Sequence, residues 1–404
     1  MTQRSRLAVC GAGTMGRGIA QVAATAGFDV LLFDTHPDVA ERARAAVVED
    51  FDRQVDKGRL TRDRADAVLS RLRTVVSQAA MAGADLLIEA VHEDLSLKRA
   101  LFAELGPLLA PGALLASNTS ALPVTALAAA APDPGRVVGM HFFNPVPRMA
   151  LCEIVVARQT APSTVREAED LAVRLGKQTV TVADTPGFLV NRVARPYYLE
   201  AVRMLGAGEG DVAGIDAAAR AVGFPMGPFT LMDLIGIDVN LAVSRAVFDG
   251  LFGEPRFRPH VLQQQQVHAG FLGRKSGRGW YELDGAGRQI LPEGRGWTRP
   301  YVGACLPGMD PVASRLVAAV INEAHHAWAE GWAGGAEGRA IVDRGVLLGL
   351  NHPHGPLAWG DALGLDSVVS VLESLARAFG GDRFRPAPLL LQRLSAAEPN
   401  PQGA

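Results

Sequence analysis

The sequence Leu7-Ala8-Val9-Cys10-Gly11-Ala12-Gly13-Thr14-Met15-Gly16 decides the fold of the first half of the chain. Its four apolar residues predict a short buried strand, and the glycines predict a turn from that strand into a helix. In a dinucleotide-binding turn the first glycine permits the tight bend, the second lets the backbone approach a pyrophosphate, and the third lets helix and strand pack closely. Gly11, Gly13 and Gly16 fit these positions. We therefore expect them to bind a dinucleotide, together with Thr14 and Met15 at the start of the helix.

The residues after this turn identify the dinucleotide. Residues 19–26 continue as an apolar helix, and a second strand, residues 30–33, ends at Asp34. An acid at that place accepts hydrogen bonds from ribose hydroxyls. No arginine directly follows Asp34, where it would neutralise a 2′-phosphate. The sequence therefore predicts NAD rather than NADP as the cofactor, with Asp34 as one of its ligands.

The order of the remaining elements predicts the fold class. Strand patterns alternate with helical ones as far as residue 183, which indicates an α/β Rossmann-type doubly wound sheet of parallel strands in a domain of residues 1–184. Asp184-Thr185-Pro186-Gly187 then breaks the pattern, and the periodicity from residue 188 onward is helical. A domain boundary is expected at this break.

The helical part contains an internal repeat. Phe224-Pro225-Met226-Gly227-Pro228 recurs as His352-Pro353-His354-Gly355-Pro356, and upstream Glu200 matches Glu323 and Asp216 matches Asp343. We therefore expect two tandem all-α modules, residues 185–284 and 309–404, with a linker of residues 285–308. The place that matches Asn191 falls near Val312, so the second module is expected to be a degenerate copy without an active site. It should dock on the first as an intrachain pseudo-dimer, and a homo-oligomer remains possible.

Composition excludes several kinds of partner. The net charge of −2 gives no reason to expect nucleic acid or an anionic membrane surface. No run of about 18 apolar residues occurs, and the N-terminus has no signal-peptide pattern. Cys10, Cys152 and Cys305 are widely spaced and odd in number, which predicts neither a disulfide framework nor a metal site. The expected location is the cytoplasm.

Candidate catalytic residues gather around Gly139-Met140-His141-Phe142-Phe143-Asn144-Pro145-Val146-Pro147. A buried strand is expected to end near His141, where the ligand crevice of an open α/β sheet lies. Glu153 is the one charge in a second apolar strand, residues 151–157, and a buried carboxylate needs a partner. His141 is the nearest candidate, since a carboxylate can fix its tautomer and stabilise its protonated form. On these two residues alone, a packed core histidine and an exposed glutamate are the simpler interpretation.

Taken together, these motifs resemble those of the L-3-hydroxyacyl-CoA dehydrogenases, and the resemblance covers nearly the whole chain. The shared motifs, in the family's order, are Ser117-Asn118-Thr119-Ser120, the His141 motif with Glu153, Asp184-Thr185-Pro186-Gly187-Phe188-Leu189-Val190-Asn191-Arg192 and Gly273-Arg274-Lys275-Ser276-Gly277. The end of the chain looks like the long bacterial branch, which acts on 3-hydroxybutyryl-CoA or 3-hydroxyadipyl-CoA. The resemblance favours catalysis over packing for His141.

The resemblance also implies a role for each matched residue. His141 is the general base and Glu153 orients it, while Ser120 and Asn191 hold the substrate's oxygens. Four more residues match positions beside the cofactor: Glu93, Lys98, Asn144 and Lys275. Lys57 matches a position near the CoA nucleotide, although the helices around it diverge from the family. The implied activity is NAD-dependent, reversible oxidation of a short L-3-hydroxyacyl-CoA, as in fatty-acid or phenylacetate-type catabolism.

Two alternatives stay open. A related dehydrogenase of sugar acids could use the same scaffold, but the His141-Phe142-Phe143-Asn144 motif argues against it. A non-catalytic, crystallin-like paralogue would keep the fold and lose the reaction. Intact Ser120, His141, Glu153 and Asn191 argue against that second alternative.

Overall fold

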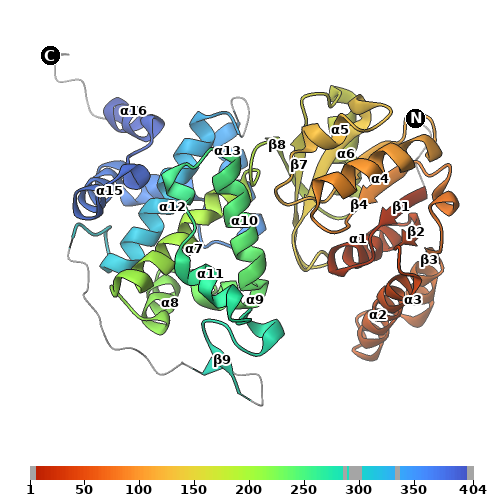
Figure 1. Ribbon diagram of the computed structural model, residues 1–404, viewed down its shortest axis with the longest axis horizontal. Helices are drawn as coiled ribbons and strands as arrows, with labels where there is room; N and C mark the ends of the chain where they lie inside the picture. The colour runs from red at the N-terminus through yellow and green to blue at the C-terminus, as the bar shows by residue number, and fades with distance from the viewer. Residues whose placement is uncertain (1–5, 285–288, 291–302, 333–336, 398–404) are drawn as a thin grey trace. The chain divides into compact units, whose positions relative to one another are not determined.

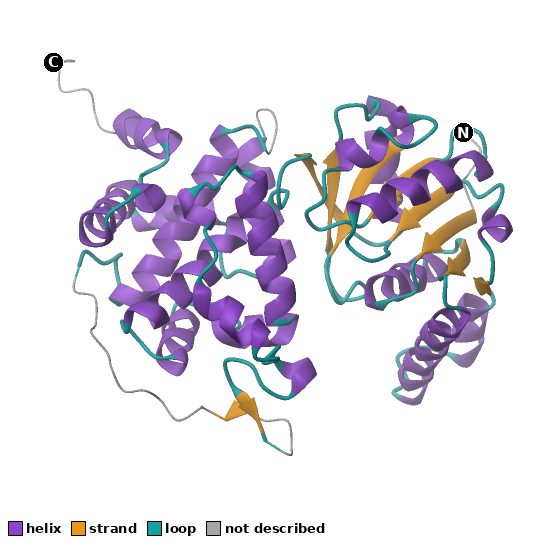
Figure 2. Ribbon diagram, viewed as in Figure 1, coloured by secondary structure: helices purple, strands orange, loops and turns teal. Residues whose placement is uncertain are grey.

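The computed structural model describes residues 6–284, 289–290, 303–332 and 337–397. The chain forms two compact units, residues 1–184 and 185–404, and each is described by itself (Figure 1). The first is a sheet covered by helices, and the second is largely helical (Figure 2). This agrees with the predicted Rossmann-type sheet followed by an all-α region.

The sheet of the first unit has the strand order β3-β2-β1-β4-β5-β6-β7-β8. Its strands are β1 (Arg6–Cys10), β2 (Asp29–Phe33), β3 (Leu72–Val75), β4 (Leu86–Glu89), β5 (Leu114–Ser117), β6 (Val137–Phe142), β7 (Leu151–Val156) and β8 (Gln178–Ala183). Neighbouring strands are parallel except at one place, where β7 runs antiparallel to β6. The expectation of parallel strands throughout is wrong there. Only residues 143–150 join β6 to β7, and a parallel crossover needs a dozen residues or more.

Helices cover both faces of this sheet. They are α1 (Thr14–Thr25), α2 (Pro37–Asp56), α3 (Arg62–Leu69), α4 (Leu95–Leu105), α5 (Val124–Ala128) and α6 (Pro162–Arg174), with short 3-10 turns η1 (Gln78–Met81), η2 (Gly106–Leu108) and η3 (Pro134–Arg136). One core lies between the sheet and helices α1, α2, α3 and α6. Met140 and Phe142 of β6 join that core. Since side chains alternate along a strand, His141 between them points to the other face, where α5 packs against β6.

The described part of the second unit consists of helices and two short strands. The helices are α7 (Val190–Ala207), α8 (Val212–Ala221), α9 (Pro228–Ile235), α10 (Ile237–Gly250), α11 (Val261–His268), α12 (Pro311–Ala329), α13 (Gly338–Leu350), α14 (Pro356–Leu363), α15 (Leu365–Phe379) and α16 (Pro388–Ala397), with turns η4 (Pro255–Phe257), η5 (Arg274–Ser276) and η6 (Asp382–Phe384). Strands β9 (Glu282–Leu283) and β10 (Gln289–Ile290) pair antiparallel. Most of the expected linker, residues 285–288 and 291–302, lies outside the described residues.

The sequence repeat has a counterpart in hydrogen bonding. The Asp216 carboxylate accepts hydrogen bonds from the backbone N–H groups of Phe229 and Thr230, at 2.8 and 2.9 Å. The Asp343 carboxylate accepts them from Leu357 and Ala358, at 2.8 and 3.1 Å. In each case an aspartate satisfies the otherwise unpaired amides in the first turn of a helix, α9 or α14. The repeated Gly-Pro that begins each helix lets the aspartate approach, because a Cβ on Gly227 or Gly355 would meet that carboxylate within 3 Å.

Candidate active site

The glycine turn after β1 has a separate steric requirement at each glycine. Gly11 has a φ of +98°, and a Cβ there would lie 2.6 Å from the carbonyl oxygen of Ala90. A Cβ on Gly16 would lie 1.8 Å from the carbonyl oxygen of Gly11, so helix and turn can pack only with glycine. Gly13 differs, because nothing lies within 4 Å of its Cβ position. The backbone is therefore open at the one glycine where a pyrophosphate would approach.

Asp34 lies beside this turn at the end of β2. Its carboxylate accepts hydrogen bonds from the backbone N–H of Ala12 at 2.9 Å and of His36 at 3.0 Å. Helix α1 begins at Thr14 and Met15, and Gly13 gives its first turn no side-chain cap. A helix N-terminus with unpaired amides favours an anion, and the acid next to it suits a ribose. The turn, α1 and Asp34 thus fit an adenosine diphosphate group without a 2′-phosphate.

His141 and Glu153 form a buried pair across β6 and β7. The antiparallel register sets them directly opposite each other, on one face of the sheet. His141 Nδ1 lies 2.7 Å from Glu153 Oε2, and Glu153 is fully buried. A carboxylate acceptor puts the ring proton on Nδ1, which leaves Nε2 as the basic nitrogen of the imidazole. The expected contact between the two residues is present.

The loop after β5 is held against the His141 strand. Asn118 Oδ1 accepts a hydrogen bond from the backbone N–H of Phe142 at 2.9 Å. Glu93 Oε1 accepts hydrogen bonds from the Ser120 backbone N–H at 2.8 Å and from the Thr119 hydroxyl at 2.6 Å. These bonds join the ends of β4, β5 and β6, so Ser120 belongs to the same cluster as His141.

Lys98 of α4 lies beneath this loop with 1% of its side chain exposed. Its ammonium contacts Glu89 Oε1 at 2.7 Å and Glu93 Oε2 at 3.1 Å. Burial alone would raise the pKa of Glu93. Lys98, together with the hydrogen bonds from Thr119 and Ser120, outweighs burial and lowers the pKa. The Glu93 side chain is therefore an anion that ties Lys98 to the loop.

Glu89 was not among the predicted site residues. Its side chain is fully buried at the end of β4 and accepts hydrogen bonds from Lys98, from the Val91 backbone N–H at 2.7 Å and from the Ser117 hydroxyl at 2.6 Å. The sequence carried a usable signal, because Glu89 is the one charge in the apolar strand β4. The same argument singled out Glu153 in β7.

The other predicted residues lie on other segments of the chain. Asn191, at the start of α7, and Lys275, whose ammonium contacts Asp238 at 2.6 Å, belong to the second unit. Asn144 is exposed in the loop after β6. Lys57 is exposed at the C-terminal end of α2, about 30 Å along that helix from the end next to Asp34. The structure does not bring Lys57 together with the residues of the cluster.

Family models match both units. Residues 6–185 match the NAD-binding domain of 3-hydroxyacyl-CoA dehydrogenase. The C-terminal domain of the same enzymes matches twice, over residues 187–283 and 312–402. The two matched stretches lie on either side of the expected linker.

Individual relatives span the chain to different extents. The 3-hydroxyadipyl-CoA dehydrogenase of Escherichia coli K12 is 38% identical, over 96% of this chain and 97% of its own. The 3-hydroxybutyryl-CoA dehydrogenase of Bradyrhizobium diazoefficiens is 40% identical over 70% of this chain and 96% of its own. A crystal structure of 3-hydroxybutyryl-CoA dehydrogenase from Escherichia coli K12 superposes with a TM-score of 0.88 at 36% identity, covering 98% of this chain and 99% of that one.

Proposed function

The chain belongs to the 3-hydroxyacyl-CoA dehydrogenase family of NAD-dependent oxidoreductases, and from this premise we propose which of its residues carry the reaction and which acyl chain it takes. The observation that carries the residue assignment is the buried His141–Glu153 pair at the carboxyl end of β6. It provides one basic imidazole nitrogen at the edge of the sheet where ligands of such folds bind.

His141 is the general base. During oxidation Nε2 takes the proton of the 3-hydroxyl group as the C3–H bond breaks, and bound NAD supplies the acceptor for the hydride. Glu153 holds the ring through Nδ1 and stabilises the imidazolium that forms. In the reverse direction the imidazolium returns the proton to the 3-oxo oxygen.

The remaining polar residues bind and orient. Ser120 and Asn191 hold the hydroxyl and thioester oxygens of the substrate, as in the family's motif. Glu93 and Lys98 lie beside the cofactor, and Asn144, in the loop after β6, and Lys275, in η5, contact the cofactor. Lys57 is assigned to the CoA nucleotide by its matched position alone.

The cofactor assignment has independent support in the backbone. The turn formed by Gly11 and Gly13, continued by Thr14, Met15 and Gly16 of α1, leaves an open cradle that a Cβ at Gly13 would enter. Asp34 adds an anion that favours free ribose hydroxyls over a 2′-phosphate. These residues would hold the adenosine half of NAD.

The preferred acyl chain is the six-carbon one that ends in carboxylate. The relative that matches 96% of this chain and 97% of its own length is named for 3-hydroxyadipyl-CoA. A second candidate is 3-hydroxybutyryl-CoA, for which several shorter relatives and a full-length solved structure are named. We propose a role in fatty-acid or phenylacetate-type catabolism.

The experiment compares two substrates in the reductive direction with NADH. The ratio of kcat/KM for 3-oxoadipyl-CoA to kcat/KM for acetoacetyl-CoA should be about ten or more. A hydrogen bond between the protein and the terminal carboxylate would contribute about 1.5–3 kcal/mol to binding. A ratio below one would favour the four-carbon chain. No turnover of either substrate would revive the non-catalytic, crystallin-like interpretation.

We also propose that the two helical modules form an intrachain pseudo-dimer. The first helix of each module packs against the other module: α7 contacts α12 and α13, while α12 contacts α8. Such an exchange of equivalent contacts is typical of a two-fold interface.

The free cysteines Cys10 and Cys152, both buried, fit the expected cytoplasmic location. No described helix is long and apolar enough to span a membrane.

A further inference from the structure

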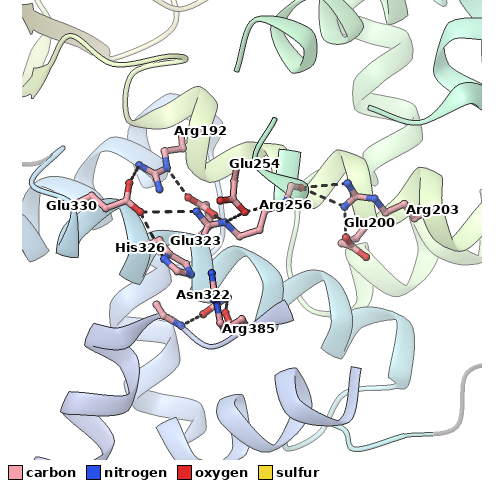
Figure 3. Close-up of polar contacts among 11 residues, drawn as sticks. Arg192, Glu200, Arg203, Glu254, Arg256, Asn322, Glu323, His326, Glu330 and Arg385 are labelled. Atoms are coloured by element: carbon pink, nitrogen blue, oxygen red, sulfur yellow. Dashed lines mark hydrogen bonds and ion pairs between the residues drawn. The ribbon is translucent and has the colours of Figure 1, made fainter. Parts of the chain in front are cut away.

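Helices α7 and α12 exchange equivalent ion pairs in the interior of the second unit. Arg192 of α7 contacts Glu323 of α12, with 2.6 Å between Nε and Oε1 (Figure 3). Arg315 of α12 contacts Glu200 of α7, with 2.8 Å between Nε and Oε2. Arg192 and Arg315 occupy matching positions of the two helices, and so do Glu200 and Glu323. All four side chains are at most 3% exposed.

A second acid completes each pair. Arg192 Nη1 lies 2.7 Å from Glu330 Oε2, and Arg315 Nη1 lies 2.6 Å from Glu209 Oε2. The guanidinium of Arg192 also lies over the Trp332 ring, 3.8 Å from its centroid. Burial alone would lower the pKa of Arg192, but Glu323 and Glu330 outweigh it and raise the pKa. The first module therefore has a buried cation whose acids both come from the second module.

The two clusters differ in what stands next to the arginine. The ion pairs align Arg192 with Arg315, so Ser314 matches Asn191, and the expected match near Val312 is off by two residues. Ser314 is buried, and its hydroxyl accepts a hydrogen bond from the Leu306 backbone N–H at 2.9 Å. Asn191 lies in the first turn of α7, and its backbone oxygen accepts a hydrogen bond from Arg195 at 2.9 Å.

We propose that the second module positions the substrate-binding residue Asn191 through Arg192. Glu323 and Glu330 fix the guanidinium of Arg192, and Arg192 fixes the first turn of α7, from which Asn191 projects. The inference rests on the proposed role of Asn191 in holding the substrate's oxygens. It makes Glu323 and Glu330 positioning residues, although their module has no active site of its own.

The physical reason is the rigidity of a doubly paired, buried guanidinium. Two carboxylates that hold different nitrogens of one guanidinium fix its direction as well as its position, and removing them leaves a buried charge without compensation. The free energy of the chain is then lower when the first turn of α7 moves so that Arg192 reaches water. A displacement of about 1 Å at a substrate-holding group can cost about a hundredfold in rate.

The test compares two matched double variants with acetoacetyl-CoA and NADH. Glu323→Gln with Glu330→Gln removes both acids from Arg192, and Glu200→Gln with Glu209→Gln removes both from Arg315. Both should lower the melting temperature. The first should lower kcat/KM for the thioester by about tenfold or more while KM for NADH stays within about twofold. The second should keep both kinetic constants within about twofold of the unmutated enzyme.

Two outcomes would overturn the inference: equal kinetic losses in both variants, or no loss in the first. Should the double variant not fold, Glu330→Gln against Glu209→Gln gives the same comparison, because Glu330 is partly exposed. Asn191→Ala tests the role of Asn191 in substrate binding separately from the positioning role of Glu323 and Glu330. If Asn191→Ala keeps full activity, the proposed role of Asn191 fails. If it is impaired, adding Glu323→Gln should cause no further kinetic loss, whereas a further loss would contradict positioning through Asn191.

Discussion

At the scale of single residues, buried carboxylates at strand ends account for the cluster around His141. Glu153 and Glu89 are both fully buried, and each has a basic partner within 2.7 Å, His141 or Lys98. A buried charge without such a partner would be costly, so each acid fixes where its partner stands. The geometry of the site follows from these two pairs.

Asp34 should control cofactor choice. It offers hydrogen-bond acceptors to ribose hydroxyls and would repel a 2′-phosphate, so the unmutated enzyme should prefer NADH to NADPH. Asp34→Ala should lower the ratio of kcat/KM for NADH to kcat/KM for NADPH, both measured with acetoacetyl-CoA. Equal values in the unmutated enzyme would contradict this assignment.

Glu89 should stabilise the first unit through Lys98. Glu89→Gln removes the negative charge and leaves the buried ammonium with Glu93 alone, so we expect a loss of about 3 kcal/mol in the free energy of unfolding. Urea denaturation measures it. The double variant Glu89→Gln with Lys98→Met should recover part of the loss, since it no longer contains the buried ammonium that Glu89→Gln deprives of its nearest counter-ion. An additive double variant would show that the two residues do not act as a pair.

At the scale of elements, local sequence patterns predicted much of the molecule. The strand, glycine turn and helix at residues 7–26 follow from apolar periodicity and glycine sterics, both of which are local properties. The reversal of β7 was missed because strand direction depends on what the following loop can span. The pairing of Arg192 with Glu323, 131 positions apart, was missed because no local pattern encodes long-range pairing.

The loop before α14 should make the second module sensitive to acid. His352 packs on Phe224 and Tyr197, and burial lowers its pKa from 6.5 to about 3. The folded state therefore excludes a proton that the unfolded state binds. This contribution to stability is complete above pH 6.5 and is lost as the pH falls toward 3, by about 2 kcal/mol at pH 5.

A substitution isolates that contribution. His352→Phe introduces the residue that the first module has at the matching position, Phe224, and cannot titrate. Its melting temperature should fall less between pH 7 and pH 5 than that of the unmutated protein. The exposed His354 gives the control, since His354→Phe should keep the original pH dependence. Identical pH dependence in all three proteins would contradict the role of His352.

At the scale of the whole molecule, the second copy of the helical module should substitute for a partner subunit. Ending the chain after Pro307 would uncover the buried residues of α7 and leave Arg192 without Glu323 and Glu330. We expect aggregation or a new dimer, measured by light scattering, because a large exposed apolar face drives association. A truncated protein that stays monomeric, with an unchanged unfolding transition, would contradict the pseudo-dimer.

The measurement that tests the central claim most directly is the turnover of 3-oxoacyl-CoA by His141→Gln, followed as loss of NADH absorbance. Glutamine keeps a polar side chain of similar size but cannot exchange the proton. We predict that kcat falls by about 10² to 10⁴, with little change in NADH affinity, and that Glu153→Gln changes kcat in the same direction. Near-normal kcat in His141→Gln, at saturating substrate, would contradict the mechanism.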